Sequence, residues 1–121
     1  MLKILLVEDH RIYREVFKDF VFAHRPGMII DEAQNGEEAL NKIKEAPPNI
    51  IFMDIRLPGR NGLDLTREIK GAFPGIQVAI LTGYDLPEYR QAAKEYGAEG
   101  FLVKESLTWE EVEAIINKQK G

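Results

Sequence analysis

The chain has 121 residues, of which 45% are hydrophobic and 30% charged, so it has the size of a single globular domain with one apolar core. It has no cysteine and a single serine, which excludes disulfide bonds, thiolate metal sites and cysteine nucleophiles and disfavours a serine hydrolase. Its net charge of −4 argues against direct nucleic-acid binding, because that affinity comes largely from Lys and Arg side chains that neutralise phosphates.

The first predicted strand is the apolar run Ile4–Val7, which Glu8 and Asp9 follow directly. A run this short is neither a secretory signal nor the ~20-residue span that crosses a bilayer. No other run approaches that length, so we expect a cytoplasmic protein without a membrane segment. Four further apolar runs each predict a strand: Met28–Ile30, Ile50–Met53, Val78–Leu81 and Phe101–Val103.

Segments with helical spacing of apolar residues separate these strands, and the first helix shows that spacing best. Its apolar side chains share one face: Ile12, Tyr13, Val16, Phe17, Phe20 and Val21. Its charged side chains are assigned to the other: Arg11, Arg14, Lys18 and Asp19. We therefore expect the apolar face to pack on a sheet and the charged face to meet water.

Local signals mark where the later helices begin and end. The predicted starts are Asn35 with Glu38, Asp85 with Pro87, and the capping box of Thr108 with Glu111. Two helices are predicted to end at Gly71 and Gly97. Helices that alternate with nearly continuous apolar strands predict an α/β fold, a doubly wound parallel sheet covered on both faces.

Side chains capable of chemistry follow several of these strands. They are Glu8 and Asp9 after the first strand, Asp54 after the third, Thr82 after the fourth and Lys104 after the fifth. Each alone could be a helix cap or an ordinary loop residue. Ligands of an open doubly wound sheet bind outside the carboxyl ends of the strands, so together they predict a site there. Asp54 is the hardest to explain otherwise, because an unpaired charge after a buried run is costly.

The three acids of this edge predict a cation site. Two carboxylates about 4 Å apart repel by roughly 4 kcal/mol at an effective dielectric near 20, so they take up protons or bind a cation. Oxygen ligands favour a hard divalent ion, above all Mg²⁺. His10 adjoins the acids, and for it exposure on the helix is a better interpretation than ligation.

No glycine-rich or Walker-type phosphate loop occurs, and the segment after the first strand is acidic. This combination favours phosphoryl transfer to a carboxylate. The metal and Lys104 would neutralise the incoming oxygens, Thr82 would hydrogen-bond the product, and Asp54 would be the nucleophile.

Four segments, in this order and spacing, resemble a response-regulator receiver domain of two-component signal transduction. They are "LLVEDH", "FMDIRLPGRNG", "AILTG" and "GFLVKES". The resemblance covers essentially the whole chain and implies one receiver domain over residues 1–121. It also implies a flavodoxin-like fold with five helices and a five-stranded parallel sheet of order 2-1-3-4-5.

Carried over by position, the resemblance implies that Asp54 accepts a phosphoryl group from a sensor histidine kinase or a small donor. Asp9 and Asp54 would bind Mg²⁺ with the main-chain carbonyl of Arg56, and Glu8 would act through a metal-bound water. The domain would catalyse only its own phosphorylation and dephosphorylation, and it would not be an enzyme for other substrates.

The resemblance also implies how the signal leaves the site. Lys104 and Thr82 would hold the phosphoryl oxygens, and Phe101 would turn inward as Thr82 moves. The surface of the fourth helix, fifth strand and fifth helix would then change, and a phosphorylation-dependent homodimer would be one result. "KES" resembles receivers attached to helix-turn-helix DNA-binding output domains, and no such domain lies within this chain.

Two residues depart from the family pattern, and two others border the site at positions where the family varies. Glu105 stands where the family usually has a proline joined to the lysine by a cis bond, which leaves the geometry of the Lys104–Glu105 peptide open. Phe101 lacks the hydroxyl of a tyrosine. Arg56 and Tyr84 occupy positions where the family tunes phosphate lifetime.

Two other functions stay open. A Mg²⁺-dependent phosphatase also uses an aspartyl nucleophile, but it places it in an Asp-x-Asp pair after the first strand, whereas Glu8 and Asp9 are adjacent. A receiver-like binding module that signals without phosphate usually lacks an acid or the lysine, and none is missing here. Turnover of generic phosphate esters would favour the phosphatase, and titration with Mg²⁺ tests the binding module.

Overall fold

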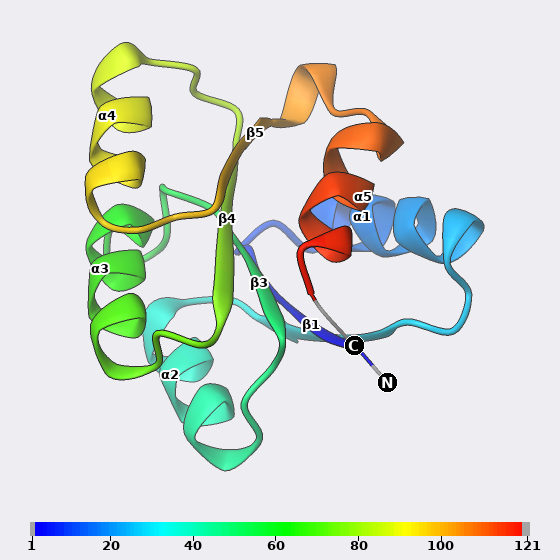
Figure 1. Ribbon diagram of the computed structural model, residues 1–121, viewed down its shortest axis with the longest axis horizontal. Helices are drawn as coiled ribbons and strands as arrows, with labels where there is room; N and C mark the ends of the chain where they lie inside the picture. The colour runs from blue at the N-terminus through cyan, green and yellow to red at the C-terminus, as the bar shows by residue number, and fades with distance from the viewer. Residues whose placement is uncertain (1, 120–121) are drawn as a thin grey trace.

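The computed structural model describes residues 2–119, in which a five-stranded parallel sheet lies between two layers of helices (Figure 1). The strands are β1 (Lys3–Val7), β2 (Ile29–Ala33), β3 (Ile50–Met53), β4 (Gln77–Thr82) and β5 (Gly100–Val103). The helices are α1 (Arg11–His24), α2 (Gly36–Glu45), α3 (Gly62–Ala72), α4 (Pro87–Glu95) and α5 (Trp109–Asn117), with a short 3₁₀ turn η1 (Lys104–Ser106). The strand order β2-β1-β3-β4-β5 confirms the predicted flavodoxin-like fold.

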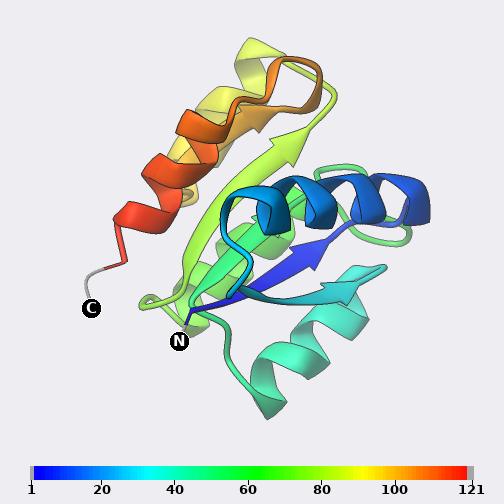
Figure 2. The same cartoon turned by 90° about the vertical axis from the view of Figure 1, so that its right-hand side faces the viewer.

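Helices cover both faces of the sheet, α1 and α5 on one and α2, α3 and α4 on the other (Figure 1). Each face of the sheet has a hydrophobic core, and the central strand β3 contributes side chains to both. Ile50 and Phe52 pack in the core with α1 and α5, and Ile51 and Met53 pack in the core on the opposite face. Burial on both faces is why this strand appears in the sequence as a continuous apolar run. The strands run in one direction, so their carboxyl ends share one edge (Figure 2).

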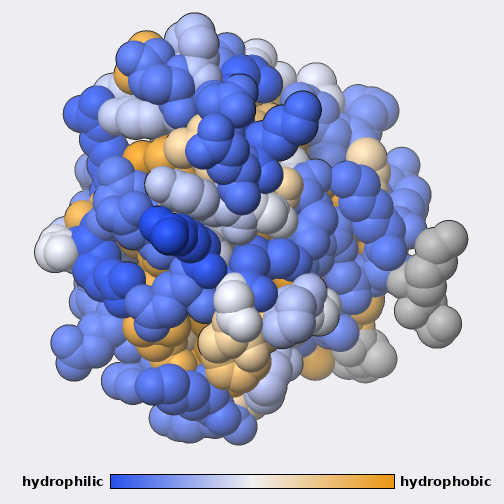
Figure 3. Space-filling model, turned by 60° about the vertical axis from the view of Figure 1, so that its left-hand side comes forward, coloured by the Kyte–Doolittle hydropathy of each residue, from blue (hydrophilic) through white to orange (hydrophobic). Residues whose placement is uncertain are grey.

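The outer surface of the three-helix layer is mostly hydrophilic. Seen with α3 and α4 turned forward, hydrophobic residues reach the surface only in separate patches (Figure 3). Each of these helices therefore directs its apolar stripe at the sheet, as amphipathic helices of α/β proteins do. Within residues 2–119, no helix is both long enough and apolar enough to cross a membrane.

The structure corrects the face predicted for α1. Ile12 and Val16 are 76% and 55% exposed, whereas Arg14, which was assigned to the charged outer face, is only 7% exposed. The buried stripe runs through Arg14, Phe17 and Val21. An arginine is tolerated inside because its guanidinium donates to the Glu32 carboxylate at 2.8 Å and to a backbone carbonyl at 2.7 Å, so its donors are satisfied.

Four strands differ from their predicted bounds, and two of them, β1 and β5, differ only by beginning one residue earlier than predicted. β2 was expected over Met28–Ile30 but runs from Ile29 to Ala33, because it is an edge strand that pairs only with β1. Its acidic residues stay partly exposed, and Asp31 lies 3.0 Å from Lys42 Nζ. β4 extends one residue beyond the predicted run at each end. Gln77 is buried within it because its amide donates to the Ile115 carbonyl at 2.9 Å.

The predicted helix boundaries hold at some positions and fail at others. The caps at Asn35 and Thr108 are confirmed, and Gly97 follows α4 with a φ of +91°. α4 begins at Pro87 as predicted, but the Asp85 side chain does not cap it and instead accepts a hydrogen bond from Arg90. Gly71 was expected to end a helix but lies inside α3, which continues to Ala72.

Candidate functional site

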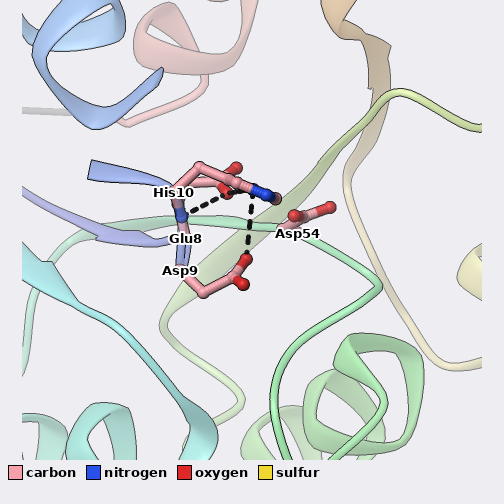
Figure 4. A group of neighbouring side chains, drawn as sticks. All are labelled: Glu8, Asp9, His10 and Asp54. Atoms are coloured by element: carbon pink, nitrogen blue, oxygen red, sulfur yellow. Dashed lines mark hydrogen bonds and ion pairs between the residues drawn. The ribbon is translucent and has the colours of Figure 1, made fainter. Parts of the chain in front are cut away.

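Four side chains gather where β1 and β3 end, as Figure 4 shows: Glu8, Asp9, His10 and Asp54. Ligand atoms from all four lie within 4.8 Å of one another. Their proximity follows from the sheet, because β1 and β3 are neighbours and Val7 is paired with Met53. The next residue on each strand, Glu8 or Asp54, is therefore brought beside the other.

Lys104 reaches this group from η1, just beyond β5. Its ammonium forms an ion pair with Glu8 and lies 3.4 Å from Asp54 Oδ2. No peptide bond within residues 2–119 is cis, so the Lys104–Glu105 bond is trans. Lys104, which follows the edge strand β5, thus contacts Glu8 and Asp54, which follow the inner strands β1 and β3, as expected from their positions after the strands.

The electrostatics of the two buried acids differ. Asp54 is 5% exposed, and burial, together with the charge of Glu8, raises its pKa from 3.8 to about 6 against the opposing effect of Lys104. Burial also acts to raise the pKa of Glu8, but hydrogen bonds from Lys104 and the His10 backbone outweigh it and lower that pKa. Near neutral pH, Lys104 therefore mainly compensates Glu8, and Asp54 is the less well compensated acid.

Asp9 completes a set of ligands that suits a hard cation. Its Oδ1 atom is buried and has no hydrogen-bond partner among the described residues, although His10 Nδ1 lies 3.3 Å away. The His10 side chain is 74% exposed, as the sequence indicated, and its ring lies against the acids from the outside. The site thus offers three neighbouring carboxylates, one of which has an oxygen without a hydrogen-bond partner among the described residues. This set of oxygen ligands fits the coordination that Mg²⁺ prefers.

Thr82 and Phe101 lie on β4 and β5, and the Thr82 hydroxyl forms no hydrogen bond with the acids within residues 2–119. Thr82 is the last residue of β4 and is fully buried, and its hydroxyl accepts a hydrogen bond from the backbone N–H of Tyr84 at 3.2 Å. Phe101 is half-buried on β5, and the guanidinium carbon of Arg90 lies 4.7 Å from its ring centroid. Both side chains therefore occupy defined positions from which they would have to move.

Arg56 connects the loop that follows β3 with the loop that follows β4. The guanidinium carbon of Arg56 lies 3.7 Å from the Tyr84 ring centroid, and Nη2 donates to the Tyr89 hydroxyl at 3.4 Å. The sequence placed Arg56 and Tyr84 at the border of the site but gave no role to Tyr89. This contact joins two loops across the rim of the site.

Sequence reasoning missed three residues that shape the site. Arg14 donates to the main-chain carbonyl of Glu8 at 2.7 Å and so holds the acidic segment from inside. The ring of Tyr13 lies 4.4 Å from Lys104 Nζ. A Cβ on Gly62 would come within 1.9 Å of the Asp54 carbonyl oxygen, so only glycine allows α3 to begin this close to the acid. The Gly-containing turn after Asp54 was the only available signal.

Comparison with known proteins gives concordant matches. The family model described as response regulator receiver domain matches residues 4–117. The transcriptional regulatory protein LnrK of Bacillus subtilis (strain 168) is 34% identical over 121 residues, which are 100% of this chain and 55% of that protein. This chain thus spans about half the length of the curated relatives it matches.

Two solved structures share the fold and about a third of the residues. A LuxR-family two-component response regulator from Aurantimonas sp. SI85-9A1 is 32% identical, with a TM-score of 0.87 over 98% of this chain and 86% of that one. The response regulator TrrA of Thermotoga maritima, solved in complex with Mg²⁺-BeF, is also 32% identical, with a TM-score of 0.83 over 98% of both chains.

Proposed function

Because this chain belongs to the response regulator receiver domain family, we propose that it is a signalling switch whose phospho-acceptor is Asp54. The phosphoryl group comes from a sensor histidine kinase or from a small donor such as acetyl phosphate, and the transfer requires Mg²⁺. The domain, which extends over residues 1–121, catalyses only this transfer and the later loss of the group by hydrolysis.

One observation carries the proposal. Asp54 is almost fully buried, yet its carboxylate has a lysine ammonium 3.4 Å away on one side and the unsatisfied oxygen of Asp9 in the same cluster. A buried acid that is incompletely compensated is typical of a functional group. Structural acids elsewhere in this chain are instead paired with cations, as Glu32 is with Arg14.

The ligands for the cation come from the same residues. Asp9, Asp54 and the main-chain carbonyl of Arg56 would hold Mg²⁺, with Glu8 acting through a water, and the ion would supply positive charge that neutralises the phosphoryl oxygens. The complex of the TrrA relative with Mg²⁺-BeF supports this assignment. Asp9 contributes the oxygen that has no other partner among the described residues.

The chain's own residues carry out the transfer. An oxygen of Asp54 forms a bond to phosphorus while the bond from phosphorus to the donor atom breaks, and the donor keeps the electron pair. Lys104 shifts from Glu8 toward the phosphoryl oxygens, and Thr82 turns its hydroxyl from the Tyr84 N–H to donate to one of them.

The output follows from the positions of two residues. When Thr82 moves toward the phosphoryl group, Phe101 turns inward and leaves the cover of Arg90, which changes the surface of α4, β5 and α5. The response is a population shift, and its extent is set by how much better these contacts are in the active conformation. A phosphorylation-dependent homodimer through this surface belongs to the proposal.

For the whole protein, we extend the proposal to regulation of transcription in the cytoplasm. Curated relatives such as LnrK are nearly twice as long as this chain, and DevR/DosR of Mycobacterium tuberculosis is a DNA-binding transcriptional activator. We assign a C-terminal helix-turn-helix output domain to the remainder, absent from this chain. The acidic receiver does not bind DNA itself, so salt-dependent retention of duplex DNA by residues 1–121 would contradict this part.

Intact-mass measurement after incubation with acetyl phosphate tests the central proposal. The parent should gain one phosphoryl group with Mg²⁺ and none with excess chelator, and the Asp54→Asn variant should gain none. Asp19→Asn, which changes an exposed acid on α1, is the matched control and should be labelled like the parent. Full labelling of Asp54→Asn would place the acceptor elsewhere.

The same preparation separates the two rival functions. Repeated turnover of p-nitrophenyl phosphate would identify a phosphatase rather than a switch. A domain that neither binds Mg²⁺ nor accepts a phosphoryl group would be a phosphate-independent binding module. The retained acids and lysine favour the switch over the binding module. Glu8 and Asp9 are adjacent and form no Asp-x-Asp pair, which favours the switch over the phosphatase.

A further inference from the structure

We propose that Tyr13 is a positioning residue that holds the Lys104 ammonium at the phospho-acceptor. Lys104 Nζ lies 4.4 Å from the centroid of the Tyr13 ring, within the range of a cation–π contact. The inference rests on the proposed function and adds to it a residue on α1 that contacts neither the phosphoryl group nor the cation.

The ring completes the surroundings of the ammonium. Lys104 forms its ion pair with Glu8, lies 3.4 Å from Asp54, and is 18% exposed. Tyr13 therefore places an aromatic face against an ammonium whose other near neighbours are carboxylates. A cation–π contact is stronger when the cation is desolvated in this way.

Lysine needs such a support because its side chain is long and flexible. Fixing it in one conformation costs rotamer entropy, and a preformed position removes that cost from the reaction. A groove of about 180 Å³ adjoins the lysine, lined in part by Tyr13, Phe20 and Leu107. Without the ring, the ammonium loses one of the groups that hold it and its position relative to Asp54 varies more, so fewer molecules are poised for transfer.

The phenol hydroxyl is not what the site uses. Burial, followed by the charges of Glu8 and Asp54, raises the pKa of Tyr13 to about 12, so the side chain stays neutral and its ring remains available to a cation. No hydrogen bond is formed by its hydroxyl within residues 2–119, whereas its ring contacts Lys104 and lies 6.4 Å from that of Phe17. Phenylalanine at position 13 should therefore keep the contact with Lys104, whereas an aliphatic residue should lose it.

Two variants test the ring against a matched control. With saturating Mg²⁺, Tyr13→Leu should lower the maximal rate of phosphorylation by acetyl phosphate about tenfold, the equivalent of a desolvated cation–π contact, with little change in the KM for donor. Tyr13→Phe should stay within about twofold of the parent on the same scale. Phe20→Leu, which changes another aromatic residue of α1 and of the same groove whose ring packs on Trp109, should also match the parent.

These outcomes separate the inference from the function on which it rests. If the parent itself is not labelled, the proposed function fails. If the parent is labelled and Tyr13→Leu reacts as fast, or Tyr13→Phe loses as much as Tyr13→Leu, the positioning role is wrong.

A double-mutant cycle tests the contact without any phosphoryl transfer. Tyr13→Leu should shift the urea unfolding equilibrium about tenfold further toward the unfolded state in the parent than in a Lys104→Met background, because only the parent has a cation to lose. Equal shifts in both backgrounds would show that the ring and the ammonium do not interact. Since Tyr13 is half-buried, leucine fits without a large cavity and the variant should unfold cooperatively.

Discussion

The two ends of the sheet use polar side chains in opposite ways. At the amino end, Lys70 donates to the Pro74 and Ile76 carbonyls and to the Glu99 carboxylate. Glu99 in turn accepts the backbone N–H of Val78 at 2.8 Å. At the carboxyl end, three acids face one lysine, and an Asp9 oxygen has no hydrogen-bond partner among residues 2–119.

The difference separates stability from function. Polar groups at the amino end close turns and strand ends, so each compensated charge stabilises the fold. At the carboxyl end, burial and then the charge of Glu8 raise the pKa of Asp54, so this incompletely compensated acid weakens the apo protein. The excess of negative charge is relieved when a cation binds or when a proton is taken up.

The largest effect should come from crowding the carboxyl end. Gly62→Ala places a Cβ within 1.9 Å of the Asp54 carbonyl, so the backbone has to move, which we expect to cost about 3 kcal/mol or more. Phosphorylation should slow with it because the acceptor shifts. The control is Gly71→Ala in α3, where nothing lies within 4 Å and alanine should stabilise by about 0.5–1 kcal/mol. Urea unfolding of both variants is the measurement, and similar stabilities would contradict the predicted clash.

The second effect is a pH-dependent gain in stability when Asp54, the buried acid, is replaced by asparagine. The folded protein holds the Asp54 proton more tightly than the unfolded chain does, so the parent loses stability as the pH rises from about 4 to about 6. Asp54→Asn does not titrate, and its advantage should grow over that range and stay constant above it. At about 1.4 kcal/mol per pH unit, a rise from 3.8 to about 6 limits the gain to about 3 kcal/mol. An advantage that is flat from pH 4 to 8 would show an unperturbed Asp54.

The third effect is a loss of stability on removing an acid at the amino end of the sheet. Glu99→Ala removes the partner of Lys70 and of the Val78 N–H, so it should destabilise by about 2 kcal/mol while phosphorylation of Asp54 proceeds at the parent rate. Denaturation and acetyl phosphate labelling of the same sample measure the two quantities. A loss of labelling would show that the two ends are coupled.

The smallest effect is stabilisation by the cation. At a Mg²⁺ concentration ten times its dissociation constant, the parent should gain about 1.4 kcal/mol by mass action. Asp9→Ala should remove most of this gain and most of the rise in melting temperature, because it deletes the unsatisfied oxygen. Asp19→Asn should keep the gain. An unchanged rise in Asp9→Ala would place the metal elsewhere.

Several features of this protein could be predicted because local chemistry decides them. The run Ile50–Met53 has no polar face, so only a strand buried on both sides suits it, and Asp54 then has to stand at its carboxyl end. The Thr108 cap is likewise a contact between residues three apart. The order of strands and segments put Glu8, Asp54 and Lys104 at one edge.

Contacts between distant segments decided the rest. Periodicity limits the apolar stripe of α1 to a broad arc, but packing of the helix on the sheet placed Arg14 inside and Ile12 outside. Arg14 can be buried because β2 continues to Glu32, whose carboxylate accepts its hydrogen bond. That edge strand is itself held by its pairing with β1. The approach of Tyr13 to Lys104 likewise spans most of the chain, and no local pattern encodes it. The sequence alone determined which residues end the strands, whereas tertiary packing determined which charges they meet, because the free energy of a buried charge depends on partners that only the fold brings within reach.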